Sequence, residues 1–160
     1  MFADRSPELP VDLAKKPVPI DWCDLELAMD DWQLDHFWYL DTETGEAIFI
    51  SEFYADDDMD EMKESIENDE SGRYLDIPRA DPGKDYRDML DWAAAVESQR
   101  LHDELWEALD RNHPFRRFRD VIEDYPTEQK EWLEFKRSRI LQLAREWLDA
   151  ERIEPIPKSG

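Results

Sequence analysis

Acidic residues dominate the first two thirds of this chain, and they constrain its fold because unpaired charges have to remain in water. The 160 residues include 42 Asp and Glu but only 20 Lys and Arg, a formal net charge of −22. Residues 1–110 contain 9 bases and 32 acids, a net charge of −23, whereas residues 111–160 contain 11 bases and 10 acids, a net charge of +1. This asymmetry governs solubility and the choice of partner, but it does not by itself set the fold.

The aromatic content indicates that an ordered core lies inside this acidic shell. Seven Trp, seven Phe and five Tyr make up 12% of the chain, although 39% of its residues are charged. Disordered acidic segments contain few aromatic residues. A chain of this length is also long enough to bury a sizeable core within one domain.

The chain has no sequence feature typical of export or membrane insertion. Cys23 is the single cysteine, so no intramolecular disulfide can form, and we expect its side chain to pack on the inner face of a helix. No apolar run approaches the ~18 residues of a membrane span, and the first residues lack the regions of a signal peptide. We therefore expect a cytoplasmic protein that does not contact the membrane.

The periodicity of apolar residues predicts an α+β protein: one domain with a small antiparallel sheet of about three strands, followed by a helical C-terminal half. We expect an extended Pro-containing arm over 1–20, in which Val18 and Ile20 can pack, a domain over 21–155 and a tail over 156–160. The predicted strands are 37–40, 47–50 and 73–77, with Gly45 in a left-handed hairpin position. The predicted helices are 21–32, which Asp21 caps and Trp32 ends, and then 84–97, 99–110, 114–124 and 128–150. Residues 56–70, which Ser71 and Gly72 end, are predicted to form a polar helix or a turn.

Metal and cofactor sites are not indicated. His36, His102, His113 and Cys23 show no ligand spacing, and four glycines cannot form a phosphate-cradling loop. Residues 41–46 alternate oxygen donors around Gly45, loosely like a calcium loop, but Ser51 stands where that loop needs a bidentate Glu, so a hairpin turn is favoured. We predict no metal and no cofactor. Because Asp and Glu are so abundant, paired carboxylates are no sign of catalysis, and we do not favour an enzyme.

An acidic cluster opens the helix predicted over 56–70. It could bind cations or imitate a phosphate backbone, while the simpler interpretation is a solvated helix N-terminus that suits the helix dipole. The cluster consists of Asp56, Asp57, Asp58, Asp60 and Glu61.

A basic-aromatic segment, His113 to Asp120, is the strongest local candidate for a ligand site. We expect Phe115, Phe118 and Ile122 to form a buried stripe of its helix and the arginines to lie outside it. Guanidinium groups bind carboxylates and phosphates in bidentate geometry. The alternative is intramolecular pairing with the many acids. The candidate binding residues are Arg116, Arg117 and Arg119, with Tyr74 and Trp106 available for stacking.

Four segments taken in order resemble an uncharacterised family of acidic bacterial proteins that has no assigned activity. They are Tyr39 to Glu46, Arg73 to Pro78, Phe115 to Val121, and Glu146 to Leu148, and the resemblance covers roughly residues 21–155. The family tends to have glycines before its Phe-Arg-Arg-Phe stretch, where this chain has Arg111-Asn112-His113-Pro114. The resemblance supports the fold and implies no catalytic residues.

Two functional hypotheses follow. The first is a non-enzymatic cytoplasmic interaction module that binds a basic protein partner, with its acids acting as a surrogate for nucleic acid. The second is binding of an anionic ligand or nucleic acid through Arg116, Arg117 and Arg119. Repulsion from the acidic residues 1–110 argues against nucleic acid as a partner. The sequence makes no prediction of the oligomeric state.

Overall fold

The computed structural model describes residues 15–158 apart from residues 32, 54–55 and 80, and it consists of two compact units. The sheet unit comprises residues 1–79 and 141–160, and the helical unit comprises residues 80–140. The sheet unit has 9 bases and 27 acids, a net charge of −18, whereas the helical unit has 11 bases and 15 acids, a net charge of −4. Most of the excess negative charge therefore belongs to the sheet unit.

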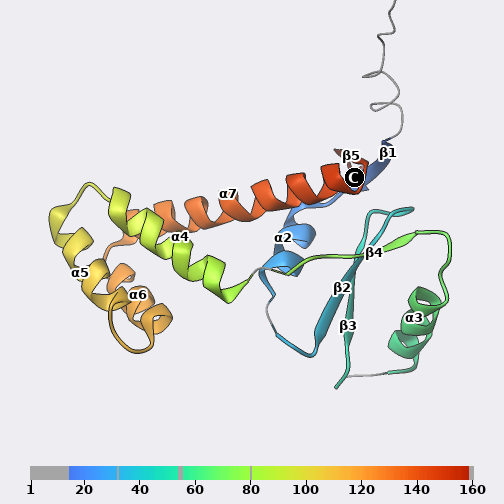
Figure 1. The fold of residues 1–160 in the computed structure, drawn as a ribbon, viewed down its shortest axis with the longest axis horizontal. Coiled ribbons are helices and arrows are strands. Elements are labelled where there is room, and N and C mark those ends of the chain that lie inside the picture. Colours follow the sequence, from blue (N-terminus) through green and yellow to red (C-terminus); the bar gives the residue numbers. More distant parts are fainter. Residues whose placement is uncertain (1–14, 32, 54–55, 80, 159–160) are drawn as a thin grey trace, which may run out of the picture. The chain divides into compact units, whose positions relative to one another are not determined.

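The sheet unit contains an antiparallel sheet of three strands in the order β3-β2-β4 (Figure 1). Its strands are β2 (His36–Asp41), β3 (Ala47–Ser51) and β4 (Tyr74–Asp76). Gly45 turns the β2–β3 hairpin with φ of 81°, which confirms the left-handed position expected from the sequence. The buried Leu40 lies opposite Ala47 on one side and Leu75 on the other, and it belongs to the core of the unit.

A second, parallel pair of strands joins the two ends of the described chain. β1 (Lys16–Ile20) pairs with β5 (Ile153–Pro157), and Val18 and Ile20 are buried, which confirms the extended, packed segment expected there. The amide of Lys16 donates to the carbonyl of Arg152, so the prolines at every second position of both strands direct their missing donors away from the partner strand. The sequence predicts the end of the domain at residue 155 and a tail over 156–160, and it does not predict this pair of strands.

The sheet unit also contains helices α2 (Trp22–Asp30) and α3 (Asp57–Glu67), which Asp21 and Asp56 cap as their side chains accept backbone N–H groups. α2 buries Leu25, Ala28 and Met29. Cys23 is exposed, so its predicted inward position is wrong: at 100° per residue it lies nearly opposite Leu25. Trp32 lies outside the described residues.

Helix α3 is shorter than predicted. It ends at Glu67 with Asn68 as its C-cap, several residues before the Ser71-Gly72 pair that was expected to end it. Gly72 does adopt a left-handed φ of 81°, but it does so in the connection to β4. Gly72 therefore provides a left-handed residue in the loop before β4 and does not terminate the helix.

The helical unit contains α4 (Pro82–Ala95), α5 (Gln99–Leu109), α6 (Pro114–Ile122) and the first part of α7 (Pro126–Ala150), whose last ten residues belong to the sheet unit. Asp81 and Ser98 cap α4 and α5. Pro114 and Pro126 open α6 and α7, where the missing proline donor removes no helical hydrogen bond. The sequence predicted these four helices with boundaries that differ by a few residues.

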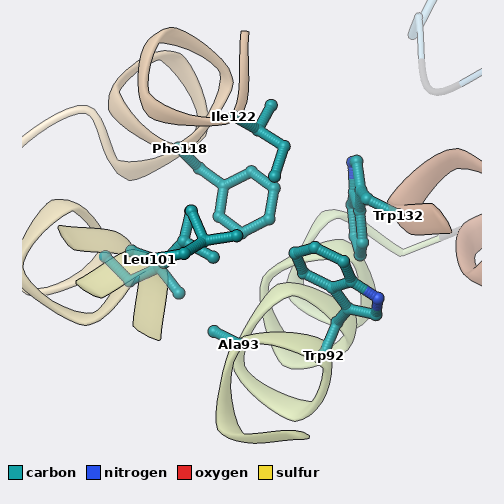
Figure 2. Packing of buried hydrophobic residues seen from close by; sticks show 8 residues of the cluster. Trp92, Ala93, Leu101, Phe118, Ile122 and Trp132 are labelled. Atoms are coloured by element: carbon teal, nitrogen blue, oxygen red, sulfur yellow. The ribbon is translucent and has the colours of Figure 1, made fainter. Parts of the chain in front are cut away.

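Aromatic side chains from three helices form the centre of the helical unit (Figure 2). The ring of Phe118 lies 4.9 Å from Trp132 and 6.3 Å from Trp92, in edge-to-face geometry. Leucines of α5 pack against these rings, and Leu101 and Leu105 are fully buried. The structure confirms the α+β class, with a three-stranded antiparallel sheet followed by a helical C-terminal half.

One carboxylate is buried beside this core. Asp88 is 2% exposed, and its oxygens lie 2.6 Å from Nζ of Lys84 and 3.4 Å from Nη1 of Arg139. Burying a charge without a partner is strongly unfavourable, so these two cations are what allow an Asp at this position of α4.

The two turn glycines of the sheet unit provide a first test. We expect Gly72→Ala to lower the free energy of unfolding by about 1 kcal/mol, the cost of a left-handed alanine. Gly45→Ala has the same φ, but its new Cβ would lie 1.7 Å from the carbonyl oxygen of Pro19, so we expect roughly 1–3 kcal/mol more. Urea denaturation of both variants measures the difference, and equal losses would show that Gly45 does not pack against β1.

The two phenylalanines of α6 provide a second test. Phe118 is 1% exposed and Phe115 is 43% exposed. Phe118→Ala should cost about 3–5 kcal/mol, because it leaves a cavity among Trp92, Trp132 and Leu101. Phe115→Ala is the matched control and should cost about 1 kcal/mol, because its ring is already half in water. Similar losses in urea denaturation would contradict this core.

Candidate binding surfaces

The acidic cluster lies at the exposed start of α3. Asp56, Asp57, Asp58, Asp60 and Glu61 are all exposed, and no residue of α3 is buried. Asp56 has a structural role, because its Oδ1 accepts the N–H of Met59 at 2.8 Å. The other four carboxylates face water at a helix N-terminus, where the dipole stabilises negative charge. Within the described residues, no group of three or more His, Cys, Asp or Glu side chains is arranged to hold a metal ion.

The arginines predicted to bind anions lie on α6. Arg116 and Arg119 are exposed, while Arg117 is half-buried and its Nε donates to the carbonyl of Asn112 at 2.7 Å. The predicted apolar stripe is correct for Phe118 and Ile122 but wrong for Phe115, which is 43% exposed and packs edge-on against Tyr86. Phe115 lies in the first turn of α6, beyond the part of the helix that the core covers.

A hollow of about 270 Å³ beside Arg117 contains more acids than bases. Arg111 lines it too, but its guanidinium lies 2.7 Å from the carboxylate of Glu107. Two arginines therefore share this hollow with three carboxylates, so it has no net positive charge with which to attract an anion. Its lining residues are Glu104, Glu107, Ala108, Arg111, Arg117, Asp120 and Val121.

Neither of the two aromatic residues proposed for stacking lines this hollow. Trp106 is 45% exposed on α5, and its ring stacks on His102 at 5.6 Å with an interplanar angle of 11°. It lines a separate hollow with Tyr86, Leu90, Asp103 and others of α4 and α5. Tyr74 belongs to β4 of the sheet unit, where the guanidinium of Arg73 covers its ring at 5.0 Å. That face of Tyr74 already has a stacking partner.

The hairpin loop over 41–46 is held by an ion pair. Asp41 is 4% exposed, and both of its oxygens accept hydrogen bonds from Arg73, each at 2.9 Å. Burial opposes ionisation of Asp41, but the bonds from Arg73 and from the N–H of Glu43 outweigh it and lower its pKa. Asp41 also raises the pKa of Arg73. The loop is a hairpin turn, as the sequence favoured, and its first carboxylate binds Arg73, the residue that precedes β4.

A groove of about 480 Å³ in the sheet unit was not foreseen from the sequence. At its wall Asp31, which follows α2, receives two side chains of β2: Nδ1 of His36 lies 2.7 Å from Oδ2, and Nε1 of Trp38 donates to the same oxygen at 2.8 Å. The ring of Phe49 on β3 meets His36 edge-on at 4.7 Å. The residues that line the groove are Leu27, Asp30, Asp31, Gln33, His36, Trp38 and Phe49.

The electrostatics of Asp31 reflect this packing. Burial opposes its ionisation, but hydrogen bonds from Trp38, His36 and the N–H of Gln33 prevail and lower its pKa below 3.8. The carboxylate thus stays ionised at neutral pH, and it adds negative charge to the wall of an otherwise largely apolar groove.

No helix in the described part of the chain is long and apolar enough to cross a membrane. This finding agrees with the absence of long apolar runs in the sequence.

The fold and these surfaces define a small, acidic α+β protein, and comparison with known proteins identifies its family. The model of the family described as "Uncharacterised protein family (UPF0158)" matches residues 16–159. The chain belongs to this family, which confirms the resemblance inferred from its four segments. It is 29% identical over 145 residues to the UPF0158 protein PA5073 of Pseudomonas aeruginosa, covering 91% of each chain. No solved structure matches the chain.

The lowered pKa of Asp31 gives a third test. Its ionised form stabilises the fold above pH 3.8, and that contribution is lost as the pH falls through the lower pKa of the folded state. We expect the indole N–H resonance of Trp38 to shift during an acid titration with a midpoint below pH 3.8. Trp38→Phe assigns the resonance, and Asp31→Asn should abolish the step. A midpoint above the ordinary value would contradict the hydrogen-bonded arrangement.

Proposed function

We propose that this protein is a non-enzymatic interaction module of the cytoplasm, which binds a basic protein partner through its sheet unit. The observation that carries the proposal is α3, where four carboxylates beyond the cap are exposed and no side chain is buried. A helix that contributes little to the core needs another reason for its composition. Residues 56–70 contain nine acids and a single base, Lys63, so this segment has a net charge of −8.

The chemistry of such a surface favours partners that normally bind nucleic acid. Rows of carboxylates present negative charge to the Lys and Arg side chains that would otherwise contact phosphates. Electrostatic complementarity of this kind increases the association rate and rejects acidic partners. The −18 charge of the sheet unit supports the same conclusion, because it repels nucleic acid itself.

The alternative is an anion site at Arg116, Arg117 and Arg119. Arg116 and Arg119 support an anion site, because both are exposed and, within the described residues, neither forms an ion pair. The three carboxylates around Arg117 weigh against it. Binding of a nucleic acid that Arg116→Ala with Arg119→Ala abolishes would favour this alternative over the first proposal.

The fourth test is capture of partners from the organism's own lysate at low and high salt, with and without nuclease. We expect a basic protein that nuclease does not release and that high salt does release, because screening shortens the range of surface charges. A variant with Asp57→Asn, Asp58→Asn, Asp60→Asn and Glu61→Gln should lose this partner. It retains Asp56 and therefore the helix cap.

The control removes the same number of charges elsewhere. Glu123→Gln, Asp124→Asn, Glu131→Gln and Glu134→Gln change four exposed carboxylates of the helical unit. This variant should retain the partner with little change in affinity. Equal loss in both variants would show that only total charge matters, and a partner that resists high salt would contradict the proposal.

A further inference from the structure

Three large apolar side chains of the sheet unit are exposed to solvent. Leu27 is 60% exposed, Leu34 is 88% exposed and Phe53 is 78% exposed. Leu27 lines the groove directly, together with the rings of Trp38 and Phe49. Single exposed leucines are ordinary, but several large apolar side chains exposed on the unit that contains an apolar groove are typical of an interaction surface.

The pairing of β2 with β3 places Leu34 and Phe53 at the same end of the sheet. His36 lies opposite Ser51, and the N–H of Glu52 donates to the carbonyl of Asp35 at 3.2 Å, one residue beyond the strands. Leu34 immediately precedes Asp35 in the sequence, and Phe53 immediately follows Glu52. Figure 1 shows that β2 begins and β3 ends on this same side of the sheet.

Acidic residues surround these apolar groups. Asp30 and Asp31 line the groove, and Asp35 and Glu52 lie between the strands and the exposed Leu34 and Phe53. Asp56, the cap of α3, follows Phe53 by three residues, so their Cα atoms are within about 11 Å of each other. Phe53 and the first residue of the acidic cluster are therefore close to each other.

We propose that the groove and its rim bind an amphipathic segment of the basic partner, with apolar anchors on one side and Lys or Arg on the other. This inference rests on the proposed function and adds where and how the partner docks. The anchors contact Leu27, Leu34, Phe53 and the rings of the groove, and the cations face Asp30, Asp31 and the start of α3. Apolar burial supplies affinity, while the charges supply rate and selectivity.

Charge complementarity selects this occupant over two others. A second copy would bring another unit of net charge −18 to the same surface. Residues 1–14 contain Asp4, Glu8 and Asp12 but only one base, Arg5, so they do not complement the acidic rim either. A basic segment from another protein is the occupant that lowers the electrostatic free energy on binding.

The fifth test uses two fluorescein-labelled synthetic peptides with the same Lys and Arg residues. One has leucines at helical spacing, and in the other every leucine is serine. Fluorescence anisotropy should show that the intact protein binds the leucine peptide at least roughly tenfold more tightly than the serine peptide. Leu34→Ser with Phe53→Ser should remove most of that difference. Leu133→Ser, at a leucine of the helical unit that is 56% exposed, is the matched control and should retain it.

The outcomes separate this inference from the proposed function. If both peptides bind equally and salt weakens both, the groove inference is overturned while the acidic interaction module stands. If neither binds at low salt, both are contradicted. Methyl resonances of Leu27 and Leu34 should shift with the leucine peptide, whereas a shift confined to the helical unit would overturn the location.

Two further results would identify a different occupant and so overturn the inference. Sedimentation velocity could reveal a dimer that Leu34→Ser with Phe53→Ser dissociates, which would assign the patch to a second copy. Alternatively, the leucine peptide could bind only after deletion of residues 1–14, which would assign it to the chain's own N-terminal segment.

Discussion

The ion pair between Asp41 and Arg73 is the interaction on which the arrangement of the sheet unit most depends. It connects the hairpin loop to the segment that enters β4, and Thr42 reinforces the link, because its N–H and hydroxyl both donate to the carbonyl of Arg73 at 2.8 Å. The loop in turn packs against β1, since Gly45 leaves no room for a side chain beside Pro19. One arginine therefore joins segments that are far apart in the sequence.

The helical unit also contains a buried carboxylate that is paired with cations. Asp88 is buried between Lys84 and Arg139, so a second carboxylate is accommodated only because two cations reach it. In a chain with 42 acids and 20 bases, three bases, Arg73, Lys84 and Arg139, are thus committed to pairing with buried carboxylates. The carboxylates that remain lie on the surface with few cations to offset them, above all on α3. The uncompensated surface, and with it the proposed binding of a basic partner, follows from how the few bases are distributed.

Local patterns were enough to predict much of this fold. The hairpin with Gly45, the cap at Asp21 and the four C-terminal helices each depend on residues close in the sequence. The predictions failed where distant packing decides. Phe115 is exposed because the core ends one turn further along α6, and Cys23 faces water because Leu25, Ala28 and Met29 define the inner face of α2. The β1–β5 pair was missed because prolines mask a strand whose partner lies more than a hundred residues away.

For the binding surfaces, the sequence by itself determined the excess of acids, the exposed character of residues 56–61 and the family to which the chain belongs. Those properties are sums over residues or short motifs, which need no knowledge of contacts. Only the tertiary structure showed that the acids around Arg117 outnumber the arginines, that Arg73 already covers Tyr74, and that Asp31, His36, Trp38 and Phe49 form a groove. The physical reason is that a groove, and the net charge within it, depend on which side chains come together in the folded protein. These residues stand at no regular spacing in the sequence, so no local pattern predicts their contact.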